Sequence, residues 1–375
     1  ASHVEYDRLI AEYLAGGRRR IRDQSISVNV LAADFLKQVA SYYVKDARPT
    51  SEQGEYRSVA GTACRLYGDQ PVEKFGPIAL KACRQEWINA GLTRQTINKR
   101  QFRLVRMFKW GVAEELVDSS VWETLRAVDT LHVGRTSVPE MKEVPPVEIE
   151  RVHAVTPFLS PVVRDMIALQ LLTGMRPGEV CRLRPGDLDR SGDVWEFDVQ
   201  GHKTAHHGRK RTVYIGPEAQ AVLRPYLLRA ADQHCFSAAE SREWWHQQKE
   251  AKRVTPASCG NARGRKNDRK PPAKNSRLPR SFFDTASYGR AIATACKKAW
   301  PAPEEMRGDK AAVKAWEDQH RWSPNQLRHT RATEVRRLYG LDAAQVILGH
   351  ARADITQVYA EVDRQKAIEI TRKIG

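Results

Sequence analysis

The residues whose types and spacing suggest chemistry lie in the second half of the sequence. Arg176 stands in the run TGMRPGE, between a helix expected to end at Gly174 and a helix expected to begin at Pro177. The free backbone N–H groups of a helix start, together with a guanidinium, suit a phosphate. Taken alone, the run is also typical of a helix–turn–helix junction in which Glu179 fixes the arginine.

Four further polar side chains follow downstream. They are Lys203, Arg328 in the run NQLRHT, His350 in the run LGH, and Tyr359 nine residues after that histidine. Two arginines can stabilise the negative charge that builds on the non-bridging oxygens of a phosphodiester during transesterification, where a metal ion could otherwise serve. A positive field also lowers the cost of ionising a tyrosine, whose free pKa is about 10. The set therefore suits phosphodiester cleavage by a tyrosine nucleophile.

The order Arg, Lys, Arg, His and Tyr resembles the catalytic set of the tyrosine recombinase, or phage integrase, family, and the resemblance covers most of the chain. It implies that Tyr359 forms a 3′-phosphotyrosyl bond, that Arg176 and Arg328 hold the scissile phosphate, and that His350 hydrogen-bonds it. Lys203 would protonate the 5′-oxygen leaving group, as in similar enzymes. The covalent bond conserves the phosphodiester energy, so we expect no ATP, no metal and no other cofactor.

The chain departs from the family at one position. Three residues before the second arginine the family usually has a histidine, where this chain has Asn325. Asparagine can donate a hydrogen bond to phosphate but cannot titrate, so general-base help to Tyr359 from this position would be lost. His329 points about 100° away from Arg328 around a helix, so we expect a packed, structural histidine and not a replacement base. His320 is a less favoured substitute.

Several of these residues also have structural interpretations. Tyr359 alone would be an ordinary half-buried helical tyrosine, and His350 could lie at a helix C-terminus. Their occurrence together with the upstream residues favours catalytic roles. Lys203 lies among other basic residues, so which of them reaches the scissile bond stays open, and the family pattern favours Lys203. The nearby run H-x-x-x-H-H has no carboxylate or cysteine partner and is a weak metal-binding signal.

The elements that must position these side chains are mostly helical. Helical periodicity dominates the sequence, and two short alternating runs, 194–199 and 211–216, predict one small antiparallel sheet in the C-terminal half. We therefore expect a mainly α, two-domain DNA clamp. The predicted parts are a basic tail (1–24), a helical core-binding, SAM-like domain (25–131), a linker (132–146), and a catalytic domain (147–375) with a basic insertion at about 249–281.

Two basic regions are candidate DNA contacts. The helical segment 93–116 carries cations on one face without acidic partners, which is unusual for a merely solvated face and favours phosphate contacts. The insertion is either a loop that orders on DNA or a disordered solubilising segment. The predicted DNA-binding residues are Arg94, Lys99, Arg100, Arg103 and Arg106 in the helix, and Lys266, Arg269 and Lys270 in the insertion.

The composition agrees with a nucleic-acid partner. Lys and Arg number 62 against 45 Asp and Glu, which leaves a net charge of +17. No window approaches the roughly 18 apolar residues of a spanning helix, and the N-terminus has no secretory h-region, so we expect a cytoplasmic, nucleoid-associated protein. The six cysteines are scattered singly, which disfavours a zinc site or a disulfide framework and predicts reduced, packed thiols.

The sequence therefore predicts a site-specific recombinase or integrase that acts on double-stranded DNA. Recombination of two duplexes needs four active sites, so we expect a tetramer on DNA, with the C-terminal segment 363–375 docked on a neighbouring protomer. Accessory DNA-bending proteins are possible further partners, and no membrane partner is expected. Two alternatives stay open: a non-cleaving, sequence-specific DNA-binding protein on the same fold, and a type IB topoisomerase-like relaxing enzyme.

Overall fold

The structure of the chain is a computed structural model that describes most of the sequence. The described residues are 25–45, 47–141, 143–199, 211–254 and 280–349, with Tyr6, Ile10, Ala11 and Leu14. Several residues that the sequence analysis singled out lie outside the described ones. They are Lys203, His350, Tyr359, Lys266, Arg269 and Lys270, together with most of the tail 1–24 and the whole segment 363–375.

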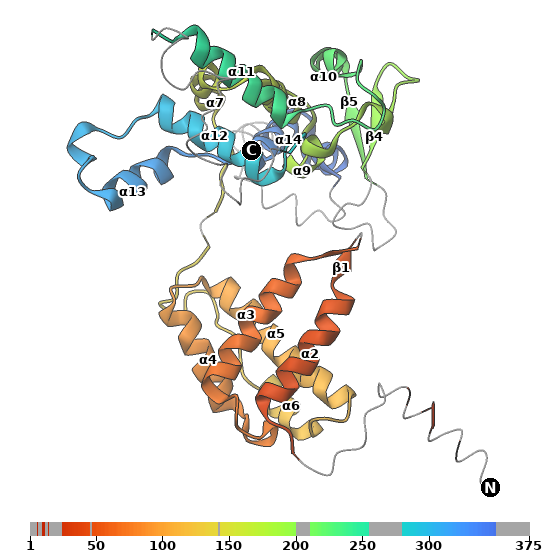
Figure 1. The fold of residues 1–375 in the computed structure, drawn as a ribbon, viewed down its shortest axis with the longest axis vertical. Coiled ribbons are helices and arrows are strands. Elements are labelled where there is room, and N and C mark those ends of the chain that lie inside the picture. Colours follow the sequence, from red (N-terminus) through yellow and green to blue (C-terminus); the bar gives the residue numbers. More distant parts are fainter. Residues whose placement is uncertain are drawn as a thin grey trace, which may run out of the picture. The chain divides into compact units, whose positions relative to one another are not determined.

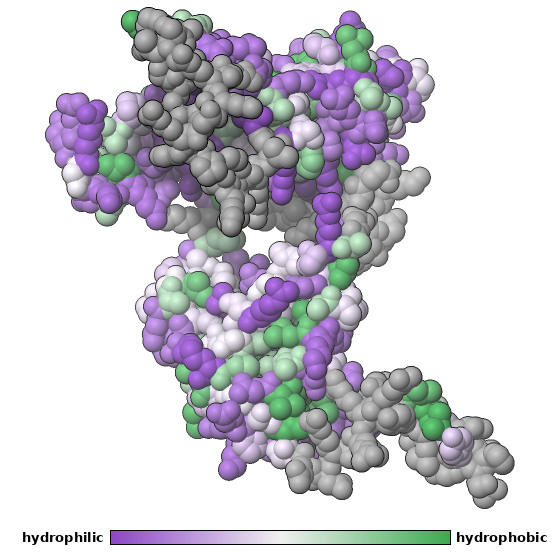
Figure 2. Space-filling view, in the orientation of Figure 1, coloured by the Kyte–Doolittle hydropathy of each residue, from purple (hydrophilic) through white to green (hydrophobic). Residues whose placement is uncertain are grey.

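The chain divides into two compact units, Ala1–Glu143 and Val144–Gly375 (Figure 1). The division falls inside residues 132–146, the stretch that the sequence predicts as a linker. Each unit has its own hydrophobic core. The face seen in Figure 2 is mainly hydrophilic, with small hydrophobic areas between the polar ones.

Unit 1 is a bundle of helices with one two-stranded hairpin. The apolar spacing of its first helix places Leu31, Phe35 and Val39 in the core, and Ser27 caps that helix by accepting a hydrogen bond from Val30 N. Its elements are α2 (Val28–Tyr42), β1 (Val44–Lys45), β2 (Arg48–Pro49), α3 (Ser51–Tyr67), η1 (Val72–Lys74), α4 (Pro77–Asn89), α5 (Arg94–Ala113) and α6 (Ser119–Arg126).

Unit 2 packs helices around a central helix, α8, which is buried on most sides and contacts α9, α10, α11 and α14. A three-stranded antiparallel sheet, in the order β3-β4-β5, joins this core, with Phe197 paired to Val213. The elements are α7 (Ile149–Val155), η2 (Thr156–Phe158), α8 (Pro161–Thr173), α9 (Pro177–Arg182), η3 (Pro185–Asp187), β3 (Leu188–Asp189), β4 (Trp195–Asp198), β5 (Thr212–Ile215), α10 (Pro217–Leu223), η5 (Arg224–Tyr226), α11 (Ala238–Ala251), α12 (Thr285–Ala299), η6 (Glu304–Met306), α13 (Lys310–His320) and α14 (Pro324–Leu348).

The long helix α14 is broken inside at Gly340, where φ is 88° and ψ is −179°. This backbone conformation is open to glycine and strained for other residues. The break matters because a straight helix would carry Leu348 about 30 Å from Arg328, at 1.5 Å per residue. Instead, the Leu348 carbonyl oxygen accepts a hydrogen bond from Arg328 at 2.7 Å. The break therefore returns the end of α14 to the region where α14 begins.

Most of the expected elements are present in the structure, and the boundary of one of them differs. The mainly helical architecture with a small antiparallel sheet is confirmed. Lys249, expected at the start of a flexible insertion, instead belongs to the last turn of α11. The reason is that the helical periodicity continues up to Ala251, before the insertion's prolines. Four of the cysteines, Cys83, Cys181, Cys235 and Cys296, are free and buried.

Candidate active site

Arg176 lies at the junction between α8 and α9, as the sequence predicts. Gly174 ends α8 in the left-handed conformation, with φ of 67°, and Pro177 begins α9. The Arg176 side chain is 40% exposed, and its Nη1 donates to Glu179 Oε1 at 2.8 Å. Its backbone N–H donates to the other carboxylate oxygen at 2.8 Å. Glu179 therefore holds both the main chain and the side chain of Arg176, which leaves one face of the guanidinium toward solvent.

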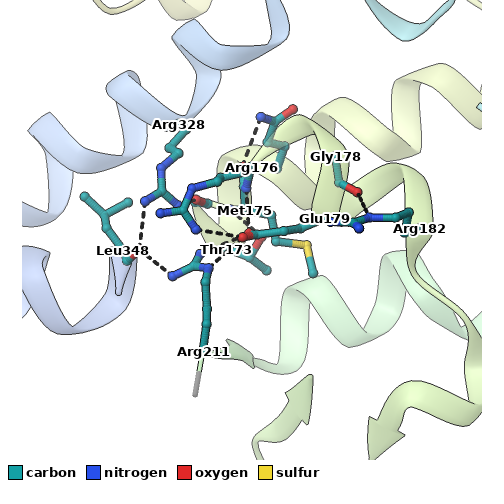
Figure 3. A network of polar contacts seen from close by, with 11 residues as sticks. Thr173, Met175, Arg176, Gly178, Glu179, Arg182, Arg211, Arg328 and Leu348 are labelled. Carbon is teal, nitrogen blue, oxygen red and sulfur yellow. Dashed lines mark hydrogen bonds and ion pairs between the residues drawn. The ribbon is translucent and has the colours of Figure 1, made fainter. Parts of the chain in front are cut away.

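Glu179 also pairs with Arg211, which precedes β5. Both side chains are almost completely buried, and Arg211 binds the carboxylate through Nε at 2.7 Å and Nη2 at 3.0 Å (Figure 3). Burial by itself raises the pKa of Glu179, but the hydrogen bonds and charge of Arg211, helped by Arg176, overcome that effect and lower the pKa to about 2. Glu179 is therefore ionised at every physiological pH.

Arg328, on the first part of α14, is buried and bound to backbone oxygens. Its Nη1 donates to Gly174 O at 2.6 Å and its Nη2 donates to Leu348 O at 2.7 Å. Arg211 Nη1 donates to the same Leu348 oxygen. Figure 3 shows Arg176 and Arg211 directed at Glu179, and Arg211 and Arg328 directed at Leu348 at the end of α14. Leu348 lies two residues before His350, so this network fixes the backbone that leads to the predicted histidine.

Two glycines allow the backbone to approach these arginines closely. A Cβ atom on Gly349, where φ is 59°, would lie 2.1 Å from Arg211 Nη1. A Cβ atom on Gly174 would lie 2.9 Å from the Leu348 side chain. Only glycine accommodates both the left-handed conformation and the close contact. The glycines in TGMR and LGH therefore have a local structural reason for their positions.

A buried amide joins the Arg176 loop to the start of α14. Gln170 Nε2 donates to Met175 O at 3.0 Å and to Pro324 O at 2.8 Å, and its carbonyl oxygen accepts from Tyr288 at 3.1 Å. All polar atoms of this amide side chain have partners, so its orientation is fixed. Gln170 thereby sets the spacing between the segments that carry Arg176 and Arg328.

The charges of this cluster do not cancel. Three guanidinium groups and one carboxylate leave a net charge of +2 around Arg176, Arg211 and Arg328. Such a preorganised, partly buried positive site can stabilise a phosphate and, more strongly, the doubly charged transition state of phosphoryl transfer. Within the described residues, no group of three or more His, Cys, Asp or Glu side chains is arranged to hold a metal ion.

Asn325 and His329 occupy the first two turns of α14. Asn325 is exposed, and its Nδ2 atom lies 2.8 Å from His329 Nε2. Burial, and secondarily the charge of Arg328, lowers the pKa of His329. His320 contacts Trp316 instead, with its Nδ1 atom 2.8 Å from the Trp316 backbone oxygen. Of the two histidines considered from the sequence, His329 is therefore the one that contacts Asn325.

The predicted basic face of α5 differs in one respect from the sequence expectation. Arg103 binds Glu52 of α3 through two hydrogen bonds, of 2.8 and 3.1 Å, and Arg94 binds Glu140 at 2.5 Å. The expectation of a face without acidic partners was therefore wrong, because carboxylates from other segments complete these pairs. Lys99 and Arg106 are exposed, and Arg100 is half-buried.

The structure thus brings together Arg176, Glu179 and Arg328 in unit 2 and adds Arg211, while Asn325 lies on the exposed side of the first turn of α14, beside His329. Arg211 does not stand out in the sequence, because its basic neighbours make the run 202–211 look like a uniformly charged turn. A usable signal was its place directly before the buried strand residues Val213 and Ile215. The positions of Lys203, His350 and Tyr359 relative to this cluster lie outside the described residues.

Comparisons with known proteins support the family resemblance. No protein-family model matches the chain. A curated relative, the tyrosine recombinase XerC of Bacillus pumilus (strain SAFR-032), is 28% identical over 174 residues, which cover 44% of this chain and 52% of the relative. The chain thus spans about half the length of the curated relative that it matches.

Solved structures share the fold at low identity. The Tn1549 transposon integrase in complex with a circular intermediate DNA has a TM-score of 0.58 and 17% identity, covering 93% of this chain and 100% of that chain. A lambda integrase tetramer bound to a Holliday junction has a TM-score of 0.60 and 13% identity, covering 96% of this chain and 87% of that chain. The resemblance inferred from the sequence motifs is therefore confirmed.

Proposed function

We propose that this chain, which resembles the tyrosine recombinases and integrases in sequence and fold, cleaves and rejoins DNA through Tyr359. The proposal covers site-specific strand exchange by transesterification, with a 3′-phosphotyrosyl intermediate and without metal or ATP. The observation that carries it is the partly buried cluster of Arg176, Arg211, Arg328 and Glu179, with its net charge of +2.

The arginine cluster suits the charge change of this reaction. A phosphodiester carries one negative charge, and the pentacoordinate transition state carries about two, so a fixed charge of +2 favours the transition state over the ground state. Arg176, being partly exposed, would contact a non-bridging oxygen directly. Arg328 would contact the phosphate after exchanging one of its backbone partners, and Asn325 would donate a further hydrogen bond.

The remaining steps belong to residues outside the described ones. Tyr359 attacks phosphorus as the phenolate, having lost its hydroxyl proton, the bond to the 5′-oxygen breaks, and Lys203 donates the proton that this oxygen needs. His350 hydrogen-bonds the phosphate. Rejoining runs the same steps in reverse with a 5′-hydroxyl from another strand. Two hydrogen bonds, from Arg211 and Arg328 to the Leu348 carbonyl oxygen, support this assignment. They hold the main chain two residues before His350 against the proposed phosphate site.

We further propose that the functional form is a tetramer on double-stranded DNA. The lambda integrase structure is a tetramer bound to a Holliday junction, and strand exchange between two duplexes requires four nucleophiles. The C-terminal segment 363–375 would connect neighbouring protomers. Lys99 and Arg106, which are exposed on α5, would contribute phosphate contacts, along with the insertion residues Lys266, Arg269 and Lys270.

Covalent trapping tests the proposed function. Wild type and Tyr359→Phe are incubated with nicked, end-labelled duplexes made from DNA that flanks the protein's own gene, then separated on denaturing and native gels. We expect a covalent protein–DNA band from wild type alone, with equal native shifts for both proteins, since the substitution removes one hydroxyl. Native shifts without a covalent band would instead favour a non-cleaving DNA-binding protein. Relaxation of supercoiled DNA without strand exchange would favour a topoisomerase-like enzyme.

A further inference from the structure

Asn325 and His329 form a hydrogen-bonded pair one turn apart on α14. The Asn325 Nδ2 atom lies 2.8 Å from His329 Nε2. At about 100° per residue, Asn325 lies between Arg328 and His329 around the helix, about 60° from one and about 40° from the other. His329 can therefore act at the Arg328 side of α14 through Asn325, although it points away from Arg328 itself.

The contact bears on the protonation of the His329 ring and on the orientation of the Asn325 amide. An amide nitrogen only donates hydrogen bonds, so the ring nitrogen that receives this bond carries no proton. The neutral form of the ring fits this contact, and burial, followed by the charge of Arg328, favours that form by lowering the pKa of His329. One amide hydrogen of Asn325 is directed at the ring in this state.

We propose that Asn325 and His329 work as one titratable phosphate-binding pair, at the position where tyrosine recombinases usually carry a single histidine. This inference rests on the proposed function. Asn325 would contact the phosphodiester oxygen, and His329 would be a positioning residue that acts through it. The family's donor and its titrating group would thus be divided between two side chains of this chain.

Protonation of His329 changes which amide atom faces a phosphate. The imidazolium Nε2 becomes a donor, so the Asn325 amide must present its oxygen to the ring, a rotation of about 180°. Both amide hydrogens then become available to an anionic oxygen, and the ring adds a positive charge nearby. A bound phosphate therefore favours the protonated ring, and the protonated ring favours the binding orientation of the amide.

Burial, followed by the charge of Arg328, is what lowers the pKa of His329. Other elements reach the first turns of α14 through uncharged groups: Gln170 of α8, Gly289 of α12, and the backbone oxygens of Pro145 and Val147.

A double-mutant cycle separates this role from a merely structural one. Wild type, His329→Gln, Asn325→His and the double variant are compared by the rate of covalent complex formation on the nicked duplexes, between about pH 5.5 and 8.5. His329→Gln keeps hydrogen-bonding capacity but cannot titrate. We expect it to lower the rate about tenfold, less than the roughly 10²–10³-fold cost of deleting a transition-state donor. It should also remove the wild-type rise in rate toward lower pH.

The Asn325→His background gives the decisive comparison. A histidine at 325 supplies donor and titrating group together, so His329→Gln in that background should change the rate less than about threefold, which is within 0.7 kcal/mol. An equal loss of rate in both backgrounds, or a wild-type pH profile that survives His329→Gln, would overturn the inference and leave His329 as a packing residue.

A second measurement does not depend on cleavage. The pKa of His329 is followed by NMR of the full chain with labelled histidine, in sodium sulfate and in sodium chloride of equal ionic strength. Sulfate, a tetrahedral dianion at all these pH values, should raise the pKa in wild type and raise it clearly less in Asn325→Ala. An equal rise in both proteins, or no rise, would refute the pair. If wild type and Asn325→His both fail to form covalent complexes, the proposed function fails and this titration alone decides the pairing.

Discussion

The substitution Glu179→Gln tests the central electrostatic argument. Glutamine keeps the size and shape of Glu179 but removes the negative charge that accepts four hydrogen bonds from Arg176 and Arg211. Arg211 is 4% exposed and would then be a buried cation without a counter-charge. Removing one partner of a buried ion pair is strongly destabilising because the remaining charge stays desolvated.

The magnitude follows from the carboxylate's acidity. Lowering the pKa of Glu179 from 4.5 to about 2 corresponds to about 3 kcal/mol of preference for the ionised form in the folded state. This value agrees with the roughly 3–5 kcal/mol typical for breaking a buried pair. We therefore expect Glu179→Gln to lower the free energy of unfolding of unit 2 by about 3 kcal/mol, or the melting temperature by roughly 6–12 °C.

Calorimetric unfolding of the full chain measures this effect. Glu304→Gln is the matched control, since Glu304 pairs with Arg307 on the surface at 79% exposure and should contribute less than about 1 kcal/mol. A group with a lowered folded pKa stabilises above its unfolded pKa. The difference between wild type and Glu179→Gln should therefore be constant from about pH 8 to 5.5 and shrink as the pH falls from about 4.5 toward 2. Equal melting temperatures for wild type and Glu179→Gln at pH 7 would refute the electrostatic account.

Three further predictions concern the backbone, DNA binding and assembly. Gly349→Ala should cost about 1–3 kcal/mol in urea unfolding, because of its positive φ and the clash with Arg211, whereas Gly308→Ala, whose Cβ would meet nothing within 4 Å, should change stability by less than about 0.5 kcal/mol. Lys99→Ala should weaken DNA binding and reduce the slope of log affinity against log salt by about 1, measured by fluorescence anisotropy, and an unchanged slope would remove Lys99 from the DNA contacts. Deleting residues 363–375 should impair synapsis, seen as loss of tetrameric complexes on native gels, more than it impairs binding of single duplexes. Unchanged recombination after the deletion would contradict the docking role.

Much of the local structure follows from the sequence because short-range physics specifies it. Gly174 and Pro177 end one helix and start the next through their backbone preferences alone, so the position of Arg176 was predictable. The apolar periodicity likewise indicated most helices and the two strands of the alternating runs. The same reasoning failed for Arg103, since its carboxylate partner Glu52 lies 51 residues away and no local pattern reveals such a pair.

The sequence by itself determined which side chains could bind a phosphate: Arg176, Arg328 and Asn325 at motif positions, with a family resemblance that suggests their roles. Only the tertiary structure decided how these groups are held. Arg211 joins them because β5 places it beside Glu179, and the break at Gly340 returns Leu348 to Arg328. These contacts join residues that lie 32 and 20 positions apart in the chain. Their energies depend on burial, which no local sequence pattern specifies.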